Sequence, residues 1–417
     1  MTEIKIDTAY WGQRAFGMLQ ELAACSENNG GPLGEVGVTR LPYTEQHKAA
    51  NELLSEWMAE AGMSVSLDAA ATLIGRLAGQ NDSKILLLGS HQDSVRQGGG
   101  FDGIMGVVLP IVVLLALKEA GWKPSFSIEI LAFADEEGVR FPTALTGSRA
   151  LAGTLNPSVL QLRDRDGTRL GEALTNFGGD EKQIVTIARS ASDLLGYLEI
   201  HIEQGPVLED QDQPLGIVTG ICGIERHEIV VTGVAAHAGT MPMHLRQDAM
   251  AGAARIVAHI EEMAHSDDRL LGVVGELNVF PNAVNAVPGR VELTAELRSV
   301  DDETREGAGQ RLRDFCLDLA NERGLEIQIE RTYFQAATPC SGALQSALQD
   351  ACPSAPRMPS GATHDASAMA DLCDIGMLFV RCRNGISHNP KECATGEDMG
   401  QAIQALAKFL SHTESQL

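Results

Sequence analysis

Gly89-Ser90-His91-Gln92-Asp93-Ser94 and Ala132-Phe133-Ala134-Asp135-Glu136-Glu137-Gly138 each come at the end of an apolar run that is typical of a buried strand, residues 85–88 and 128–133. Ligands of open α/β sheets bind in the crevice beyond the carboxyl ends of the strands. Histidine and carboxylate side chains at two such ends can supply both metal ligands and a general base. The sequence therefore predicts an α/β protein with a mostly parallel sheet and a hydrolytic metal centre at the edge of that sheet.

Two further apolar runs also end close to a histidine. His201 lies in Glu199-Ile200-His201-Ile202-Glu203-Gln204-Gly205, and His388 lies in Asn384-Gly385-Ile386-Ser387-His388-Asn389-Pro390. Asp102 lies between glycines in Gly100-Phe101-Asp102-Gly103, which lets the backbone turn sharply and approach a metal closely. This residue is the best candidate for a carboxylate that bridges two ions about 3.5 to 4 Å apart. The nitrogen and oxygen ligands suffice for two metals.

The other carboxylates have distinct expected roles. Because Glu136 and Glu137 are adjacent, their side chains diverge, so one can bind a metal while the other faces the reacting water. Asp93 can accept the N–H of His91 and fix the tautomer of that ring. A single histidine beside a strand, or one acidic run, is more often an ordinary polar feature than a metal site. Several strand ends that carry the same chemistry together favour the metal site.

Composition limits the class of protein. The chain has 417 residues with 44% hydrophobic content, enough for two domains. Its formal charge of -24 argues against binding to nucleic acid or to an anionic membrane. The eight cysteines are scattered without a C-x-x-C pair, as is typical of reduced thiols in a cytosolic protein. The first seven residues contain no signal peptide, so we expect a cytoplasmic protein. The longest apolar run, residues 104–117, is shorter than the roughly 20 residues that span a bilayer and predicts a buried core helix.

The order of predicted elements changes twice along the chain. Residues 1–212 alternate between strands and helices, which predicts a helix-covered, mostly parallel sheet. Residues 213–332 predict a β-α-β-β-α-β order, which is the ferredoxin-like arrangement and indicates an inserted domain. Polar segments at 209–214 and 336–339 would be its hinges. Residues 333–417 would rejoin the first domain, because His388 is needed to complete the metal site.

Eight sequence blocks resemble the M20 metallopeptidase-like superfamily, and the resemblance covers nearly the whole chain. They are most similar to its amidase branch, which contains N-carbamoyl-L-amino-acid hydrolases, β-ureidopropionases and allantoate amidohydrolases. The blocks are Gly89-Ser90-His91-Gln92-Asp93, Gly99-Gly100-Phe101-Asp102-Gly103, Glu136-Glu137-Gly138-Val139-Arg140-Phe141, His201-Ile202-Glu203-Gln204-Gly205, Ala236-His237-Ala238-Gly239-Thr240-Met241-Pro242, Pro281-Asn282-Ala283-Val284-Asn285-Ala286-Val287-Pro288-Gly289, Ser360-Gly361-Ala362-Thr363-His364-Asp365-Ala366 and Asn384-Gly385-Ile386-Ser387-His388.

The resemblance implies a role for each ligand. One metal would be held by His91, Asp102 and His201, and the other by Asp102, Glu137 and His388. Each subunit would therefore bind two divalent ions, of zinc, manganese, cobalt or nickel. By the same resemblance, the general base would be Glu136.

The resemblance also implies a substrate site. Arg298 would clamp the substrate carboxylate, because a guanidinium forks onto two oxygens. His237, on the inserted domain, would reach the site of a partner subunit in a homodimer that forms through that domain. Arg226 lies where some members have a further substrate arginine. The pocket would be lined by Gln204, Asn285 and the turn of Gly361 and Ala362. Gln92 and Ala286 depart from the residues usual in the family and leave the substrate open.

The resemblance implies an amidohydrolase. Its substrate would be a small carboxylate that carries a ureido group, such as an N-carbamoyl-L-amino acid, and the products would include ammonia and carbon dioxide. Allantoate or ureidoglycolate remains an alternative substrate. A dipeptidase or aminoacylase of the same superfamily would share the metals and differ in the pocket. A catalytically silent binding module would need a lost ligand or base, and every position is filled.

Overall fold

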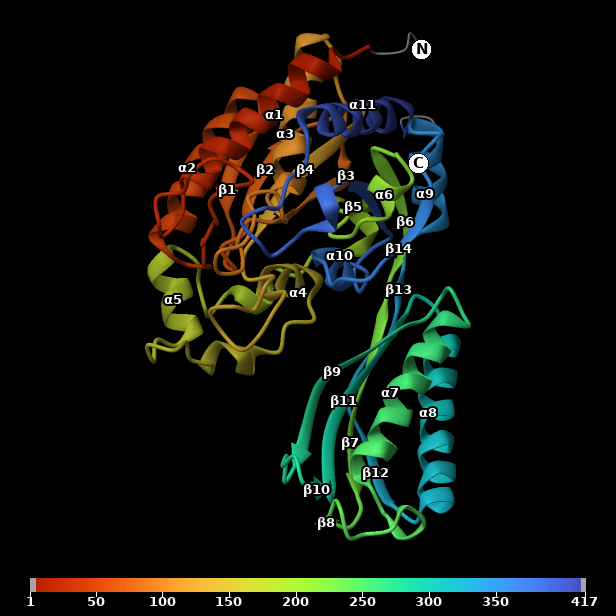
Figure 1. Cartoon of the computed structure of the whole chain (residues 1–417). Coiled ribbons are helices and arrows are strands. Elements are labelled where there is room, and N and C mark those ends of the chain that lie inside the picture. The colour runs from red at the N-terminus through yellow and green to blue at the C-terminus, as the bar shows by residue number, and fades with distance from the viewer. Residues whose placement is uncertain (1–4, 414–417) are drawn as a thin grey trace. The chain divides into compact units, whose positions relative to one another are not determined.

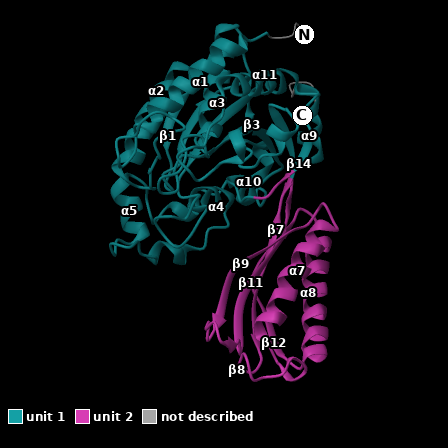
Figure 2. Cartoon of the chain, viewed as in Figure 1, with its two compact units in different colours: residues 1–219, 340–358, 362–417 teal, residues 220–339, 359–361 magenta. Residues whose placement is uncertain are grey.

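The computed structural model describes residues 5–413 and divides into two compact units (Figure 2). The first unit contains residues 1–219, 340–358 and 362–417, and the second contains residues 220–339 and 359–361. Residues 1–4, which are part of the segment that predicted a cytoplasmic protein, lie outside the described residues. No helix within residues 5–413 is long and apolar enough to cross a membrane.

The first unit is built on a mostly parallel sheet, as the sequence predicts (Figure 1). Its four central strands pair in parallel in the order β4 (Phe126–Phe133), β3 (Asn81–His91), β5 (Leu194–Ile202) and β15 (Ile375–Val380). Outside them lie β1 (Ser64–Leu67), β2 (Leu73–Leu77), β6 (Leu215–Ile221), β13 (Thr338–Pro339) and β14 (Arg357–Ser360). The pairs β1–β2, β2–β4, β6–β15 and β6–β13 are antiparallel, and β14 also pairs with β6. Because β3, β4 and β5 run in the same direction, their carboxyl ends meet at one edge of the sheet.

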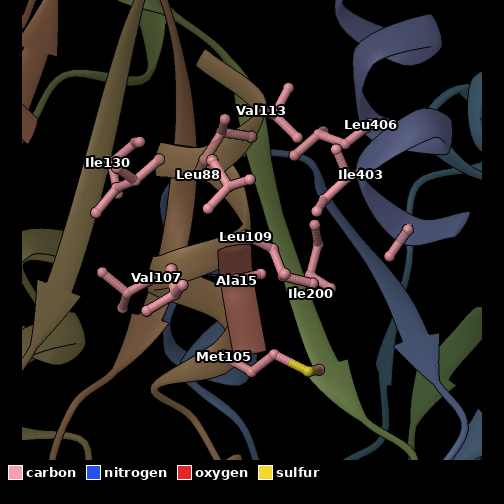
Figure 3. Packing of buried hydrophobic residues seen from close by; sticks show 14 of the residues in the cluster. Ala15, Leu88, Met105, Val107, Leu109, Val113, Ile130, Ile200, Ile403 and Leu406 are labelled. Atoms are coloured by element: carbon pink, nitrogen blue, oxygen red, sulfur yellow. The ribbon is translucent and has the colours of Figure 1, made fainter. Parts of the chain in front are cut away.

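Helix α3 (Met105–Glu119) forms the centre of the core. All thirteen residues from Met105 to Leu117 are buried, because the helix is apolar on every side and packs both on the sheet and on α1 (Thr8–Ala23) and α11 (Gly396–Thr413). Figure 3 shows Leu109 and Val113 among side chains of the strands and of α11. The prediction that residues 104–117 form a core helix is confirmed.

The other helices of the first unit are shorter or lie nearer its surface. Helix α2 (Glu45–Glu60) begins after Thr44, whose hydroxyl accepts the N–H of His47, and the chain leaves it through Gly62 at φ +93. Helix α10 (Asp365–Met369) contacts β5 and β15. The remaining helices are α4 (Thr146–Ala152), α5 (Leu170–Phe177), α6 (Val207–Asp210) and α9 (Gly342–Ala351).

The second unit has a four-stranded antiparallel sheet covered by two helices. The strand order is β12 (Glu326–Gln335), β7 (Gly223–Thr232), β11 (Arg290–Ser299) and β9 (Leu271–Phe280). Asp248 caps the start of α7 (Ala249–His265), and Gly324 at φ +61 ends α8 (Asp302–Arg323). Along the chain these elements follow the β-α-β-β-α-β order, with two short strands, β8 (Ala236–His237) and β10 (Ala286–Val287), paired beside them.

The unit boundaries differ from the expected ones. The chain leaves the first unit after Thr219 and returns to it at Cys340, rather than at 212 and 333, and Pro359–Gly361 also belongs to the second unit. The first difference arises because β6 pairs with β15 from Leu215 onward, so the polar turn at 209–214 lies within the first unit. The second arises because β12 continues to Gln335 and extends the second unit beyond residue 332.

Candidate metal centre

The carboxylate of Asp102 lies among three imidazoles in the first unit. Its Oδ1 is 3.1 Å from Nε2 of His201 and 3.6 Å from Nε2 of His91, while its Oδ2 is 3.3 Å from Nε2 of His388. His91 ends β3 and His201 lies near the end of β5. Gly103 has a φ of +65, and a Cβ there would lie 2.3 Å from the ring of His91. The glycine after Asp102 therefore permits this close approach.

Two glutamates at the end of β4 complete the arrangement. Oε2 of Glu137 is 3.7 Å from Nε2 of His388, and Oε2 of Glu136 is 4.0 Å from Nε2 of His91. The two side chains thus point to different histidines. Three groups, each with its ligand atoms within 4.8 Å of one another, are His91 with Asp102 and His201, Asp102 with Glu137 and His388, and His91 with Glu136 and Glu137.

This donor set fits divalent metal ions. The first two groups share Asp102, and each uses a different oxygen of that carboxylate. Among the described residues, Oε1 of Glu137 is buried and has no hydrogen-bond partner. A buried carboxylate oxygen without a partner is costly unless an ion or water binds it. Mixed imidazole and carboxylate ligands suit zinc and several other divalent ions.

Burial and the neighbouring groups shift the pKa values of the site's carboxyl groups in different directions. Burial would raise the pKa of Asp102, but hydrogen bonds from its three histidines outweigh burial and hold the pKa well below the usual range. For Glu136, burial raises the pKa well above the usual range, opposed by His91 and reinforced by Glu137 and Asp365. Burial, reinforced by Asp102, also raises the pKa of Glu137 to about 7. The same burial is therefore outweighed at Asp102, whose pKa is lowered, and prevails at the two glutamates, whose pKa values are raised.

Backbone carbonyls orient the imidazoles. Nδ1 of His91 is 2.9 Å from the carbonyl oxygen of Asp93, and Nδ1 of His201 is 2.9 Å from that of Ile202. An N–H donated to a carbonyl fixes the tautomer that leaves Nε2 free as a ligand.

The expected role of the Asp93 side chain is wrong. Its Oδ1 is 3.9 Å from Nδ1 of His91, because the carbonyl of the same residue takes that position. The carboxylate instead accepts the backbone N–H groups of Glu136 at 3.2 Å and Glu137 at 3.3 Å. Asp93 therefore supports the glutamate turn by its side chain and His91 by its main chain.

Sequence analysis missed several buried polar residues beside the ligands. The ring centroid of His364 is 4.5 Å from that of His201, and Glu199 joins these two histidines in a further group of possible ligands. Glu199 also accepts the hydroxyl of Ser90 at 2.6 Å. His364 lies in the block of residues 360–366, from which only the Gly361-Ala362 turn was expected to contribute, and Ser90 and Glu199 lie in the stretches that contain His91 and His201.

The predicted substrate residues are divided between the units. Gln204 lies in the first unit, where its Nε2 donates to Oδ2 of Asp102 at 2.8 Å. Ala362 also belongs to the first unit. Those in the second unit are Arg226, His237, Asn285, Arg298 and Gly361.

Within the second unit, the two arginines share one carboxylate. Nε of Arg298 donates to Oε1 of Glu296 at 2.8 Å, and Nε of Arg226 donates to its Oε2 at 3.0 Å. Arg298 also donates to the carbonyl of Gly361 and lines a cavity of about 650 Å³ with it. His237 is exposed, and the carbonyl of the nearby Asn285 accepts the N–H of Ala238 at 2.9 Å.

The metal centre and the fold that carries it define a class of metal-dependent hydrolase. The sequence profile of peptidase family M20/M25/M40 matches residues 87–412, and the chain belongs to this family. The family expected from the sequence blocks is thereby confirmed.

Individual relatives are amidohydrolases. The chain is 41% identical over 411 residues to the N-carbamoyl-L-amino acid amidohydrolase of Geobacillus stearothermophilus, which covers 97% of this chain and 98% of that protein. It is 37% identical to the allantoate deiminase of Arabidopsis thaliana, over 88% of this chain and 76% of the relative. A crystal structure of a hydantoinase/carbamoylase family amidase from Burkholderia multivorans matches with a TM-score of 0.89 and 34% identity, over 98% of each chain. The prediction of the amidase branch is confirmed.

The contacts of Asp93 lead to a stability prediction. In Asp93→Ala the N–H groups of Glu136 and Glu137 lose their acceptor, and each buried unpaired group costs about 1 to 3 kcal/mol. We expect a lower free energy of unfolding in urea for the metal-free protein. Asp93→Asn keeps one acceptor oxygen and should lose less. Equal stability of Asp93→Ala and the wild type would contradict the assigned contacts.

Proposed function

We propose that this protein hydrolyses the ureido C–N bond of a small carboxylate, such as an N-carbamoyl-L-amino acid, and releases ammonia and carbon dioxide. The observation that carries this proposal is the pair of ligand groups that share Asp102, with Glu136 beside them. The names of the relatives with 41% identity support the ureido substrate. The acidic chain and its resemblance to enzymes of small molecules favour a cytoplasmic enzyme without nucleic-acid or membrane partners.

The chain would hold two ions, one by His91, Asp102 and His201 and the other by Asp102, Glu137 and His388. Bound divalent ions polarise a carbonyl and lower the pKa of a water, and zinc, manganese, cobalt and nickel all suit these ligands. Glu136 takes the proton of the attacking water and returns it to the leaving nitrogen. Its Oε2 lies 4.0 Å from Nε2 of His91, which is close enough for one water to lie within reach of both residues.

Allantoate is the second candidate substrate. Several relatives at 36% to 37% identity are named allantoate deiminase, and they also match 87% or more of this chain. Both candidate substrates carry a ureido group and a carboxylate, so the metal centre does not separate them. Ammonia release from allantoate, ureidoglycolate, N-carbamoyl-β-alanine and a panel of N-carbamoyl-L-amino acids, compared by kcat/KM, identifies the substrate.

The first functional prediction concerns the metals and the base. Chelation should abolish turnover, and divalent metal should restore it. Glu136→Gln should still bind metal but lose most of its kcat, because no group remains to take the water proton. Glu137→Gln is the matched variant, and it should lose metal as well as activity. Metal content by mass spectrometry and ammonia release are the measurements, and full turnover in a metal-free preparation would contradict the mechanism.

Arg298 provides a second prediction. If it binds the substrate carboxylate, Arg298→Leu should weaken transition-state binding by roughly 2 to 5 kcal/mol, as for the loss of one partner of a buried charge pair. The measurement is kcat/KM for the acid and for the corresponding amide. Arg290→Leu is a matched control, because Arg290 forms a similar pair with Glu292, two residues along the same strand, at 2.9 Å. Equal effects of the two substitutions would exclude the role of Arg298.

The second unit would serve for dimerisation and closure. In this proposal the protein is a homodimer that forms through the second unit, and His237 reaches the metals of the partner subunit to donate to the developing oxyanion. Two features of the second unit support a role for His237 at the protein surface. His237 lies in a turn of small residues, and its Nδ1 accepts only the N–H of Gly239, at 3.1 Å, among the hydrogen bonds of the described chain. Asn285 and Arg298 would bind substrate from the same unit.

Mixed subunits test this arrangement. His237→Ala and Glu136→Gln should each be inactive alone. A mixture should recover part of the activity, because a mixed dimer contains one site with an intact base and an intact donor from the partner. Ammonia release is measured after subunit exchange, which is followed by native mass spectrometry. A mixture that exchanges subunits but stays inactive would show that His237 does not act in trans.

A further inference from the structure

Glu392 is a buried carboxylate to which the proposed reaction assigns no role. Its side chain is fully buried, and it lies four residues beyond His388. Its Oε1 accepts the backbone N–H of Phe101 at 2.9 Å and that of Asp102 at 3.0 Å. These donors are 291 and 290 residues away along the chain. One carboxylate oxygen of the C-terminal segment thus binds the turn that presents Asp102.

The second oxygen of Glu392 connects to the same ligand by another route. Its Oε2 is 2.8 Å from the hydroxyl of Ser387, and that hydroxyl is 2.7 Å from Oδ2 of Asp102. Ser387 directly precedes His388, whose Nε2 is 3.3 Å from the same Oδ2. Glu392 therefore contacts both the main chain of Asp102 and the loop that carries His388.

The packing around Gly99 shows that this position of Glu392 is built into the fold. A Cβ on Gly99 would lie 2.0 Å from Oε1 and 2.1 Å from Cδ of Glu392. The φ of Gly99 is not in the left-handed region, so the backbone alone does not require a glycine there. Space for the carboxylate is the physical reason for a residue without a side chain.

We propose that Glu392 is a positioning residue of the metal centre, which holds the Asp102 turn against the Ser387-His388 loop in the geometry that binds both ions. The inference rests on the proposed two-metal function. Asp102 belongs to both ligand groups, so a shift of its turn disturbs both of them at once. Residues that support metal ligands from behind typically change metal affinity by 10- to 100-fold when they are replaced.

Cobalt titration tests the proposal without substrate. Wild type and variants are depleted of metal, and Co²⁺ binding is followed by competition with a chelator and by the visible absorption bands, which report the ligand geometry. Glu392→Ala should bind Co²⁺ roughly 10- to 100-fold more weakly and with altered bands. Glu392→Gln should stay within about threefold of the wild type, because its amide oxygen can accept both N–H groups and its amide nitrogen can donate to Ser387.

Asp68 offers a matched control. Its Oδ1 also accepts two backbone N–H groups of one turn, from Ala70 at 2.8 Å and Thr72 at 2.9 Å, but Asp68 belongs to none of the ligand groups of the described chain. Asp68→Ala should lower stability while it leaves the Co²⁺ affinity and absorption bands unchanged. If Glu392→Ala gives a wild-type affinity and spectrum, or no larger a change than Asp68→Ala, the positioning role is overturned.

A steric variant covers the case in which Glu392→Ala does not fold. Gly99→Ala displaces the carboxylate of Glu392 and should weaken Co²⁺ binding in the same direction, whereas Gly17→Ala, with no atom within 4 Å of the added Cβ, should not. Wild-type Co²⁺ binding by Gly99→Ala would overturn the proposal. Failure of the wild type to bind Co²⁺ would overturn the metal function itself, whereas failure to cleave ureido acids would leave the positioning role intact.

Discussion

The buried carboxylate of Asp102 must present one oxygen to each of two ligand groups, and the first unit is arranged around this requirement. A buried charge is stable only when its oxygens are fully paired. Three histidines, Gln204 and Ser387 converge on it, and Glu392 holds its backbone. The turn leads directly into α3. Because α3 is buried on every side, its packing fixes where the helix begins. The ligand position is therefore set by the hydrophobic core as much as by the polar contacts.

The parts of the fold and site that could be predicted are those with a local signal. Apolar runs that end in histidine or glutamate predicted β3, β4 and β5, and the uniform apolarity of residues 104–117 predicted α3. Resemblance in short blocks predicted two groups of three residues whose possible ligand atoms lie close together in the structure. Contacts between distant segments have no such signal. The pairing of Glu392 with the Asp102 turn, and the use of the Asp93 carbonyl rather than its carboxylate, depend on how loops approach in space. The unit boundary depended on strand pairing beyond a polar turn.

The second unit shows how strand register groups residues that seem unrelated along the chain. Arg226 of β7 pairs directly with Glu296 of β11, and Arg298 lies two residues further on the same face of β11. The two arginines therefore share one carboxylate, although 72 positions separate their numbers (298 minus 226). Arg226, Glu296 and Arg298 therefore form one cluster of charged side chains in the second unit.

The split of the first unit along the chain has a consequence for the order of folding during synthesis. The second unit is nearly continuous, so its core can form once residue 339 has emerged from the ribosome. The first unit cannot close at that time, because β15 fills a central position in its sheet and α11 covers α3 and α1. Until then the apolar surface of α3 is incompletely covered, and His388 is not yet beside Asp102. The nascent chain thus carries a folded domain in the middle of an incomplete one, and the segment that contains β15 and α11 both covers the core and brings His388 to Asp102.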